Sequence, residues 1–177
     1  MNQYKKALFM IIELFLRIVI SPFLRAYLLK ICGAKIGRNV RIYEVHFLNL
    51  SNGFSNLYIE DDVHIGMGCR IDLEGAVHIH RGATISLGVT ILSHYNPGEQ
   101  HNSPLCKEFP PVVGKVDIGN YCWIGCNTTI LAGSIIPERT AVGACSLVKG
   151  RLEANSVYLG IPAKKIRDLK TIKKETC

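Results

Sequence analysis

Aliphatic residues recur at steps of six along most of this chain, and no other feature limits the fold as much. The series are Ile36, Ile42 and Leu48; Ile59, Ile65 and Ile71; Ile79, Ile85 and Ile91; and Ile118, Ile124, Ile130, Ile136, Val142 and Val148. A period of six fits neither an α-helix nor a single alternating strand. It fits short strands joined by tight turns, each with one aliphatic residue pointing inward, so that stacked copies bury one continuous column. We therefore predict an all-β solenoid.

The residues between the aliphatic positions support stacked coils. A small residue often stands four positions after the aliphatic one: Cys69, Ala83, Cys122, Thr128, Ser134, Thr140 and Ser146. Gly often follows the aliphatic residue directly, as in Ile118-Gly119 and Ile124-Gly125, where a corner needs unusual backbone angles or close approach. Three hexapeptides make one triangular coil. The coils are expected to begin near Ile36, Ile59, Ile79, Ile118 and Ile136.

The longest break in the repeat lies between Ile91 and Ile118, so residues 94–115 are predicted to leave the solenoid as a loop. The loop holds His94 and His101 among several Pro, Gly and Asn residues. A long loop carried by a rigid scaffold is a common place for function.

Residues 4–31 are predicted to form an apolar helix before the solenoid. Glu13, Arg17, Ser21 and Arg25 are spaced by four and form one narrow polar stripe, while Pro22 should kink or break the helix. The wide apolar face must be covered by a membrane surface, by the protein's own core or by another subunit. A true span is disfavoured, because charged residues near its centre cost roughly 2.5–3.5 kcal/mol each.

Composition narrows the class of protein further. The 177 residues suggest one domain, and the net charge of +7 favours anionic partners. Seven cysteines without a CxxC pair argue for reduced thiols in a reducing compartment, and the N-terminus does not read as a signal peptide. A cytoplasmic protein is expected, peripheral on the inner face of the membrane if the helix binds lipid. A nucleic-acid role has little support, because the basic tail lacks interleaved aromatic residues.

Four motifs resemble one known superfamily. They are the segments 116–125 (VDIGNYCWIG), 129–137 (TILAGSIIP), 141–148 (AVGACSLV) and 160–167 (GIPAKKIR). Together they are similar to the maltose, galactoside and capsular-sugar O-acetyltransferases of the hexapeptide-repeat superfamily. The resemblance implies a left-handed parallel β-helix, a homotrimer with active sites between subunits, and acetyl-CoA as co-substrate with no metal. The expected organisation is a helical segment at 1–35, a β-helix at 36–160 and a basic tail at 161–177 with a short C-terminal helix.

The resemblance also implies a site. His94 occupies the place of the family's catalytic histidine and is the expected general base, since a neutral imidazole can accept the proton of an attacking hydroxyl. His101 is the second candidate. Asp72, Glu74 or a backbone carbonyl is expected to orient the base.

The residues that match the family's cofactor-binding positions are Trp123, Gly125, Cys126, Ala144, Lys149, Lys164 and Arg167. A backbone N–H near Gly125 and Cys126 is a candidate oxyanion donor, and the basic residues would meet the phosphates of CoA. His78 and His80 would share one strand face, which hints at a metal, but no third ligand is evident at family spacing.

The expected function is acetyl-CoA-dependent O-acetylation of a sugar hydroxyl in surface polysaccharide biosynthesis. Acceptors of the capsule and O-antigen members are often lipid-linked or close to the membrane, which suits an apolar helix. Two alternatives stay open: N-acetylation of an amino sugar on a nucleotide carrier, and a non-catalytic or γ-carbonic-anhydrase-like β-helix.

Overall fold

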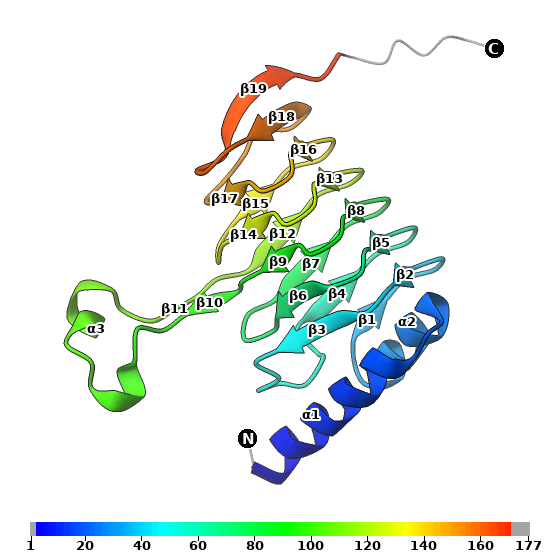
Figure 1. Ribbon diagram of the computed structural model, residues 1–177, viewed down its shortest axis with the longest axis vertical. Coiled ribbons are helices and arrows are strands. Elements are labelled where there is room, and N and C mark those ends of the chain that lie inside the picture. The colour runs from blue at the N-terminus through cyan, green and yellow to red at the C-terminus, as the bar shows by residue number, and fades with distance from the viewer. Residues whose placement is uncertain (1–2, 171–177) are drawn as a thin grey trace.

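The computed structural model describes residues 3–170, which form a triangular β-helix capped at one end by two helices (Figure 1). The first face is a parallel sheet of β1 (Lys35–Ile36), β4 (Leu57–Ile59), β7 (Val77–Ile79), β12 (Val116–Ile118) and β15 (Ile135–Ile136). The second contains β2 (Arg41–Ile42), β5 (His64–Ile65), β8 (Thr84–Ile85), β13 (Trp123–Ile124), β16 (Ala141–Val142), β18 (Ser156–Leu159) and β19 (Lys164–Asp168). The third contains β3 (Val45–Leu48), β6 (Cys69–Asp72), β9 (Thr90–Ile91), β14 (Thr129–Ile130) and β17 (Leu147–Val148).

The six-residue repeat places the strands as predicted. Across the first sheet the aligned residues are Ile36, Ile59, Ile79, Ile118 and Ile136, which are the five expected coil starts. All five are buried, so each coil adds one aliphatic layer to a continuous core.

One repeat position was wrong. Phe47, not Leu48, aligns with Ile71 of the next coil and is buried, whereas Leu48 is half-exposed. The segment from Ile42 to Phe47 of β3 is one residue shorter than the matching segment from Ile65 to Ile71 on the next coil. Because strand side chains alternate, a shift of one residue exchanges the inner and outer faces.

The small residues lie where consecutive coils touch. Cys69, Ala83 and Thr128 are fully buried, and the Thr128 hydroxyl donates to the Gly143 carbonyl at 3.0 Å. Gly125 shows why larger residues are excluded from the corners, because a Cβ there would lie 2.5 Å from the Ala144 nitrogen.

The N-terminal segment forms two helices, α1 (Gln3–Ile18) and α2 (Pro22–Ile31), with the predicted break at Pro22. The Ser21 hydroxyl caps α2, and Pro22 occupies its first turn, where a missing N–H costs nothing. The buried side of α2, which includes Leu29, covers the open end of the first coil. Among residues 3–170, no helix has the length and apolarity that crossing a bilayer requires.

The polar stripe of the helices faces the solenoid. The Arg25 guanidinium is buried and donates to the carbonyls of Leu16, Val19 and Ile42. Arg17 pairs with Glu44 at 3.4 Å, and Glu13 accepts a hydrogen bond from the Phe47 amide at 3.3 Å. Leu16 is buried, and Phe9 and Ile12 pack against the core. The other large apolar side chains of α1, which include Ile11 and Phe15, are exposed to solvent.

The predicted C-terminal helix is wrong over the part of the tail that the structure describes. Residues Lys164–Asp168 form β19, which pairs antiparallel with β18. β18 would otherwise be an open sheet edge, and a strand satisfies its unpaired backbone groups where a helix would not. Residues 171–177 lie outside the described residues.

Candidate active site

The loop predicted at 94–115 leaves the solenoid after β9 as a two-stranded arm (Figure 1). Strands β10 (His94–Tyr95) and β11 (Val112–Val113) pair antiparallel, and the tip carries η1 (Glu99–His101) and α3 (Leu105–Glu108). His94 is the first residue of the arm, so the corner between the third and first sheets holds its backbone.

His94 meets a buried carboxylate at this corner. Its Nδ1 lies 2.5 Å from Oδ2 of Asp72, the last residue of β6 on the preceding coil. Asp72 is 1% exposed, whereas the His94 side chain keeps 28% of its surface exposed. The pair therefore joins a fixed inner group to an accessible outer ring.

Donors surround the Asp72 carboxylate. Oδ2 also accepts from the Ser93 amide at 2.9 Å, the Ser93 hydroxyl at 2.9 Å and the His94 amide at 3.0 Å. Oδ1 accepts from Asn49 Nδ2 at 2.9 Å and the Glu74 amide at 3.1 Å. Burial alone would raise the pKa of Asp72, but the hydrogen bonds from His94, Asn49 and the backbone outweigh it and hold the pKa below its ordinary value.

This arrangement selects one tautomer of His94. An ionised carboxylate only accepts hydrogen bonds, so Nδ1 must carry the proton and Nε2 is left with its lone pair. A histidine held in this way can take a proton at Nε2, and the carboxylate stabilises the resulting imidazolium. Of the three groups expected to orient His94, Asp72 is the one that contacts its ring.

Two other candidates stand apart from this pair. Glu74 contributes its backbone amide to Asp72. His101 lies at the exposed tip of the arm in η1, and none of its hydrogen-bonding side-chain atoms has a partner within residues 3–170.

Part of the expected cofactor-binding set forms one ladder on the outer face of the second sheet. Trp123 aligns with Ala141, Ala141 with Val157, and Val157 with Arg167. The Trp123 ring is exposed, and its Nε1–H donates to the Ser86 hydroxyl at 3.1 Å. Aromatic and cationic groups therefore lie along a single line across four strands.

The corner after the second sheet holds Gly125, Cys126 and Ala144, and the fourth remaining residue of the set, Lys149, follows β17 of the third sheet. The Gly125 amide donates to the Val142 carbonyl at 2.7 Å, so it is committed to the strand ladder. The Cys126 amide has no such partner within residues 3–170. Ala144 and Lys149 are exposed on the neighbouring coil.

Two cations of β19 have no counter-ion among residues 3–170. Lys165 pairs with Glu153 and Asp168, each at 2.7 Å. Lys164 and Arg167 form no ion pair with any residue in the range 3–170. They are the exposed charges of β19 that an anion can reach.

Two cysteines are excluded as nucleophiles by their surroundings. Burial raises the pKa of the Cys69 and Cys122 thiols to about 11 each. Both side chains fill the core, so they pack as small apolar groups and are not thiolates at neutral pH.

The triangular β-helix of stacked hexapeptides is the architecture of the hexapeptide-repeat acetyltransferases. A crystal structure of a hexapeptide-repeat acetyltransferase from Vibrio cholerae superposes with a TM-score of 0.80 at 18% identity, over 93% of this chain and 90% of that one. Galactoside acetyltransferase in complex with coenzyme A superposes with a TM-score of 0.63 at 25% identity, over 85% of this chain and 75% of that one. The fold is therefore the left-handed parallel β-helix.

Sequence relatives agree with the structural neighbours. The chain is 37% identical over 137 residues to the dTDP-4-amino-4,6-dideoxy-D-glucose acyltransferase of Escherichia coli, covering 75% of this chain and 70% of that protein. It is 30% identical over 145 residues to WcaF of Escherichia coli K12, a protein named for colanic acid biosynthesis acetylation, covering 81% and 74%. No family model matches the chain. The chain belongs to the hexapeptide-repeat acyltransferases and is an acyltransferase enzyme.

Proposed function

We propose that this enzyme transfers an acetyl group from acetyl-CoA to a sugar hydroxyl in surface polysaccharide biosynthesis, with His94 as the general base. The observation that carries the proposal is the contact of His94 Nδ1 with the buried Asp72 carboxylate. Relatives named for acetylation in colanic acid and lipopolysaccharide biosynthesis support the substrate class.

The pair performs the two proton transfers that the reaction requires. Nε2 of His94 accepts the hydroxyl proton while the acceptor oxygen forms a bond to the thioester carbon. The tetrahedral intermediate then breaks its carbon–sulfur bond, and the departing sulfur receives the proton from Nε2. The Cys126 amide is the candidate donor to the oxyanion, because the Gly125 amide is already bonded.

The outer face of the second sheet is the proposed acetyl-CoA site. Lys164 and Arg167 would bind the phosphates, and Trp123 would lie beside the pantetheine and acetyl end. Lys149, which follows β17 of the third sheet, is the remaining cation of the expected set. Exposed Ala144 leaves room for the pantetheine arm. Galactoside acetyltransferase, whose structure holds coenzyme A, supports a cofactor site on this fold.

A complete site would need a second copy of the chain. His94 stands at the corner between the third and first sheets, whereas Trp123 and Arg167 lie on the second sheet, which is the opposite side of a triangular prism. We propose a homotrimer in which His94 of one subunit faces the second sheet of its neighbour.

Subunit mixing tests this arrangement. His94→Ala removes the base, and Ala144→Trp blocks the cofactor face at an exposed position. Random trimers from an equal mixture of the two inactive chains should recover about one quarter of wild-type activity. At each site His94 is intact in about half of the cases, and the cofactor face of the neighbouring subunit is intact in about half of those. Absence of recovery in trimers that contain both chains would show that each site lies within one subunit.

N-acylation of a nucleotide-linked amino sugar is the second candidate. The relative at 37% identity is named as an acyltransferase of a dTDP-linked amino sugar. An amine and a hydroxyl would use the same base and donor site, so matched acceptors must distinguish them. Faster turnover of a nucleotide-linked amino sugar than of its hydroxyl counterpart would assign N-acylation.

The apolar side of α1 and α2 is proposed to bind an anionic membrane surface. Its exposed large side chains are Leu8, Met10, Ile11, Leu14, Phe15, Ile18, Ile20, Phe23, Leu24, Tyr27 and Ile31. The flanking cations Lys5 and Lys30 are exposed, and basic residues beside an apolar helix face favour anionic lipid.

Vesicle sedimentation tests this proposal. Wild type should sediment with phosphatidylglycerol vesicles, and the double variant Ile11→Ser/Phe15→Ser should not. Leu87→Ser, at an exposed corner of the β-helix, is the matched control. Vesicle binding that survives the double substitution contradicts the proposal.

The main test is thiol release from acetyl-CoA with a panel of sugar and glycan acceptors. His94→Ala should lower acceptor-dependent release by roughly 10²-fold or more. His101→Ala, in the same arm, should not change it. Wild-type rates in the His94 variant would refute general-base catalysis by this residue.

A further inference from the structure

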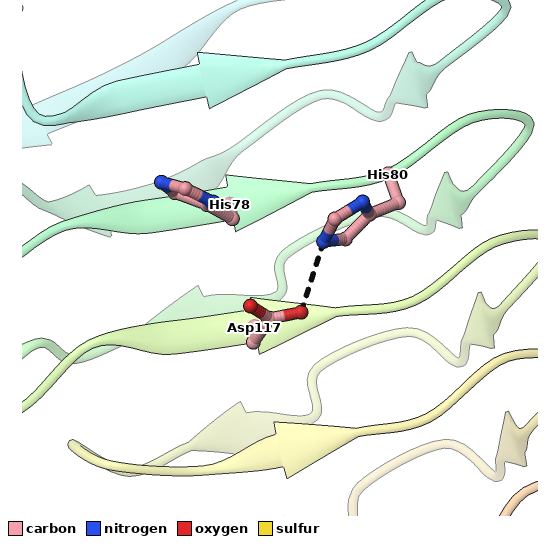
Figure 2. Close-up of side chains that lie close together, drawn as sticks. All are labelled: His78, His80 and Asp117. Atoms are coloured by element: carbon pink, nitrogen blue, oxygen red, sulfur yellow. Dashed lines mark hydrogen bonds and ion pairs between the residues drawn. The ribbon is translucent and has the colours of Figure 1, made fainter.

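Two histidines and an aspartate meet on the outer face of the first sheet, away from the corner that holds His94. His78 and His80 are two residues apart, so they share one face of β7 and the turn after it. Asp117 of β12 aligns with His78 across the sheet. Figure 2 shows the three side chains on the same side of these neighbouring strands, and one ligand atom of each lies within 4.8 Å of the others.

His80 lies between two carboxylates. Nδ1 is 3.0 Å from Glu60 Oε1, and Nε2 is 3.0 Å from Asp117 Oδ1. A neutral imidazole has one N–H and one lone pair, so it can donate to only one of them. The second contact requires a cation between the ring nitrogen and the carboxylate, either a proton or a metal ion.

In many metal sites the ring nitrogen of a histidine that does not bind the metal donates to a carboxylate, and Glu60 lies in that position next to His80 Nδ1. A carboxylate that accepts from one ring nitrogen fixes the tautomer and directs the other nitrogen toward the metal. Here Glu60 would hold the proton of His80 on Nδ1 and present Nε2 to the space shared with Asp117 and His78. Lys115 pairs with the other oxygen of Asp117, Oδ2, at 2.5 Å, and leaves Oδ1 to face His80.

The neighbouring coil orients His78 and leaves the cluster accessible. The His78 ring lies against Tyr58, its aligned residue on β4, with ring centroids 4.1 Å apart. Tyr58, Glu60, His78 and His80 border an open cavity of about 570 Å³. An ion can therefore reach the ligand atoms from solvent.

We propose that His78, His80 and Asp117 bind one divalent transition metal ion, with Zn²⁺ as the ion that suits two imidazoles, one carboxylate and a water. The ion would join β7 to β12, which are adjacent in space although the arm at 94–115 separates them in sequence. Its role is to fasten the coils on either side of the arm, and it takes no part in acetyl transfer.

The test is calorimetric titration of Zn²⁺ into the full-length protein after EDTA treatment, with accessible thiols blocked by iodoacetamide. Wild type should bind one ion per chain, and its Tm should rise by about 5–10 °C at a Zn²⁺ concentration about 100-fold above Kd. His78→Ala and His80→Ala should abolish this binding. Glu60→Gln should weaken it by about 10–100-fold, because the outer carboxylate only positions His80.

His46→Ala is the matched control, since His46 is paired with a single carboxylate, Glu44, at 2.9 Å. It should bind Zn²⁺ as wild type does. The proposal is overturned if wild type gives neither heat nor a Tm shift, in which case a proton links His80 to its two carboxylates. It is also overturned if the His78 and His80 variants keep wild-type affinity, which would place the ion elsewhere.

Discussion

Replacing Asp72 with Asn tests the proposed chemistry most directly, because it removes the charge and keeps the shape. The carboxylate accepts four hydrogen bonds at Oδ2 and two at Oδ1. An amide has only one oxygen. In its better orientation the Asn oxygen replaces Oδ2, and its NH₂ group then faces the donors of Asn49 and Glu74.

The loss of stability follows from the two donors, Asn49 Nδ2 and the Glu74 amide, that lose their acceptor. A buried donor left without an acceptor costs about 1–3 kcal/mol, so Asp72→Asn should lower the free energy of unfolding by about 2–6 kcal/mol. The catalytic effect is separate. A neutral Asn no longer stabilises the His94 imidazolium or enforces the Nδ1–H tautomer, so kcat should fall by roughly 10²-fold or more even in the folded fraction.

Urea denaturation measures the first effect, and acceptor-dependent thiol release at a temperature where the variant is folded measures the second. Asp62→Asn is the matched control, since Asp62 is exposed and, among residues 3–170, its carboxylate accepts only from Asn39, at 2.8 Å. A folded Asp72→Asn enzyme with wild-type kcat would refute the role assigned to the pair, whatever its stability.

Three further predictions concern Asp72, Arg167 and Gly125. The lowered pKa of Asp72 contributes stability that is fully present above its unfolded pKa of about 3.9 and is lost as pH falls through the folded value. The difference in unfolding free energy between wild type and Asp72→Asn should therefore shrink as pH falls below about 4, and a difference that stays the same between about pH 4 and about pH 3 would contradict this. Arg167→Ala should raise the KM for acetyl-CoA several-fold with little change in kcat, as expected for a phosphate contact; an unchanged KM argues against that contact. Gly125→Ala should destabilise the fold by about 1–3 kcal/mol, because its Cβ would lie 2.5 Å from the Ala144 nitrogen, and an unchanged urea midpoint would show that the corner can open.

The solenoid was predictable because its constraint is local and repeated. Each coil needs an aliphatic residue at the same place, so a period of six in the sequence gives the strand positions directly. The prediction failed at Leu48, where one corner is a residue shorter, and at Lys164–Asp168, where an open sheet edge decides the structure. Neither a shortened corner nor a free edge leaves a signal in the residues themselves.

For the N-terminal helices, too, the sequence predicted one feature and not another. Pro22 marked their boundary because proline acts through its own ring. The polar stripe was visible as a period of four, but its direction was not. Arg25 turns inward because it donates to the carbonyls of Leu16 and Val19, at the end of α1, and to the Ile42 carbonyl on the first coil, and these carbonyls come from separate segments of the chain.

The orienting residue of the base is the clearest case of information that only stacking provides. Asp72 and Glu74 end the same coil and are both carboxylates, so the sequence left either one open. In the structure the coil that carries Ser93 and His94 stacks on the coil that carries Asp72, and this places four donors of the upper coil on one oxygen of the lower. Glu74 adds only its amide. The acid that orients His94 is therefore chosen by which side chain points into the corner between two coils, and that corner exists only after the coils have stacked.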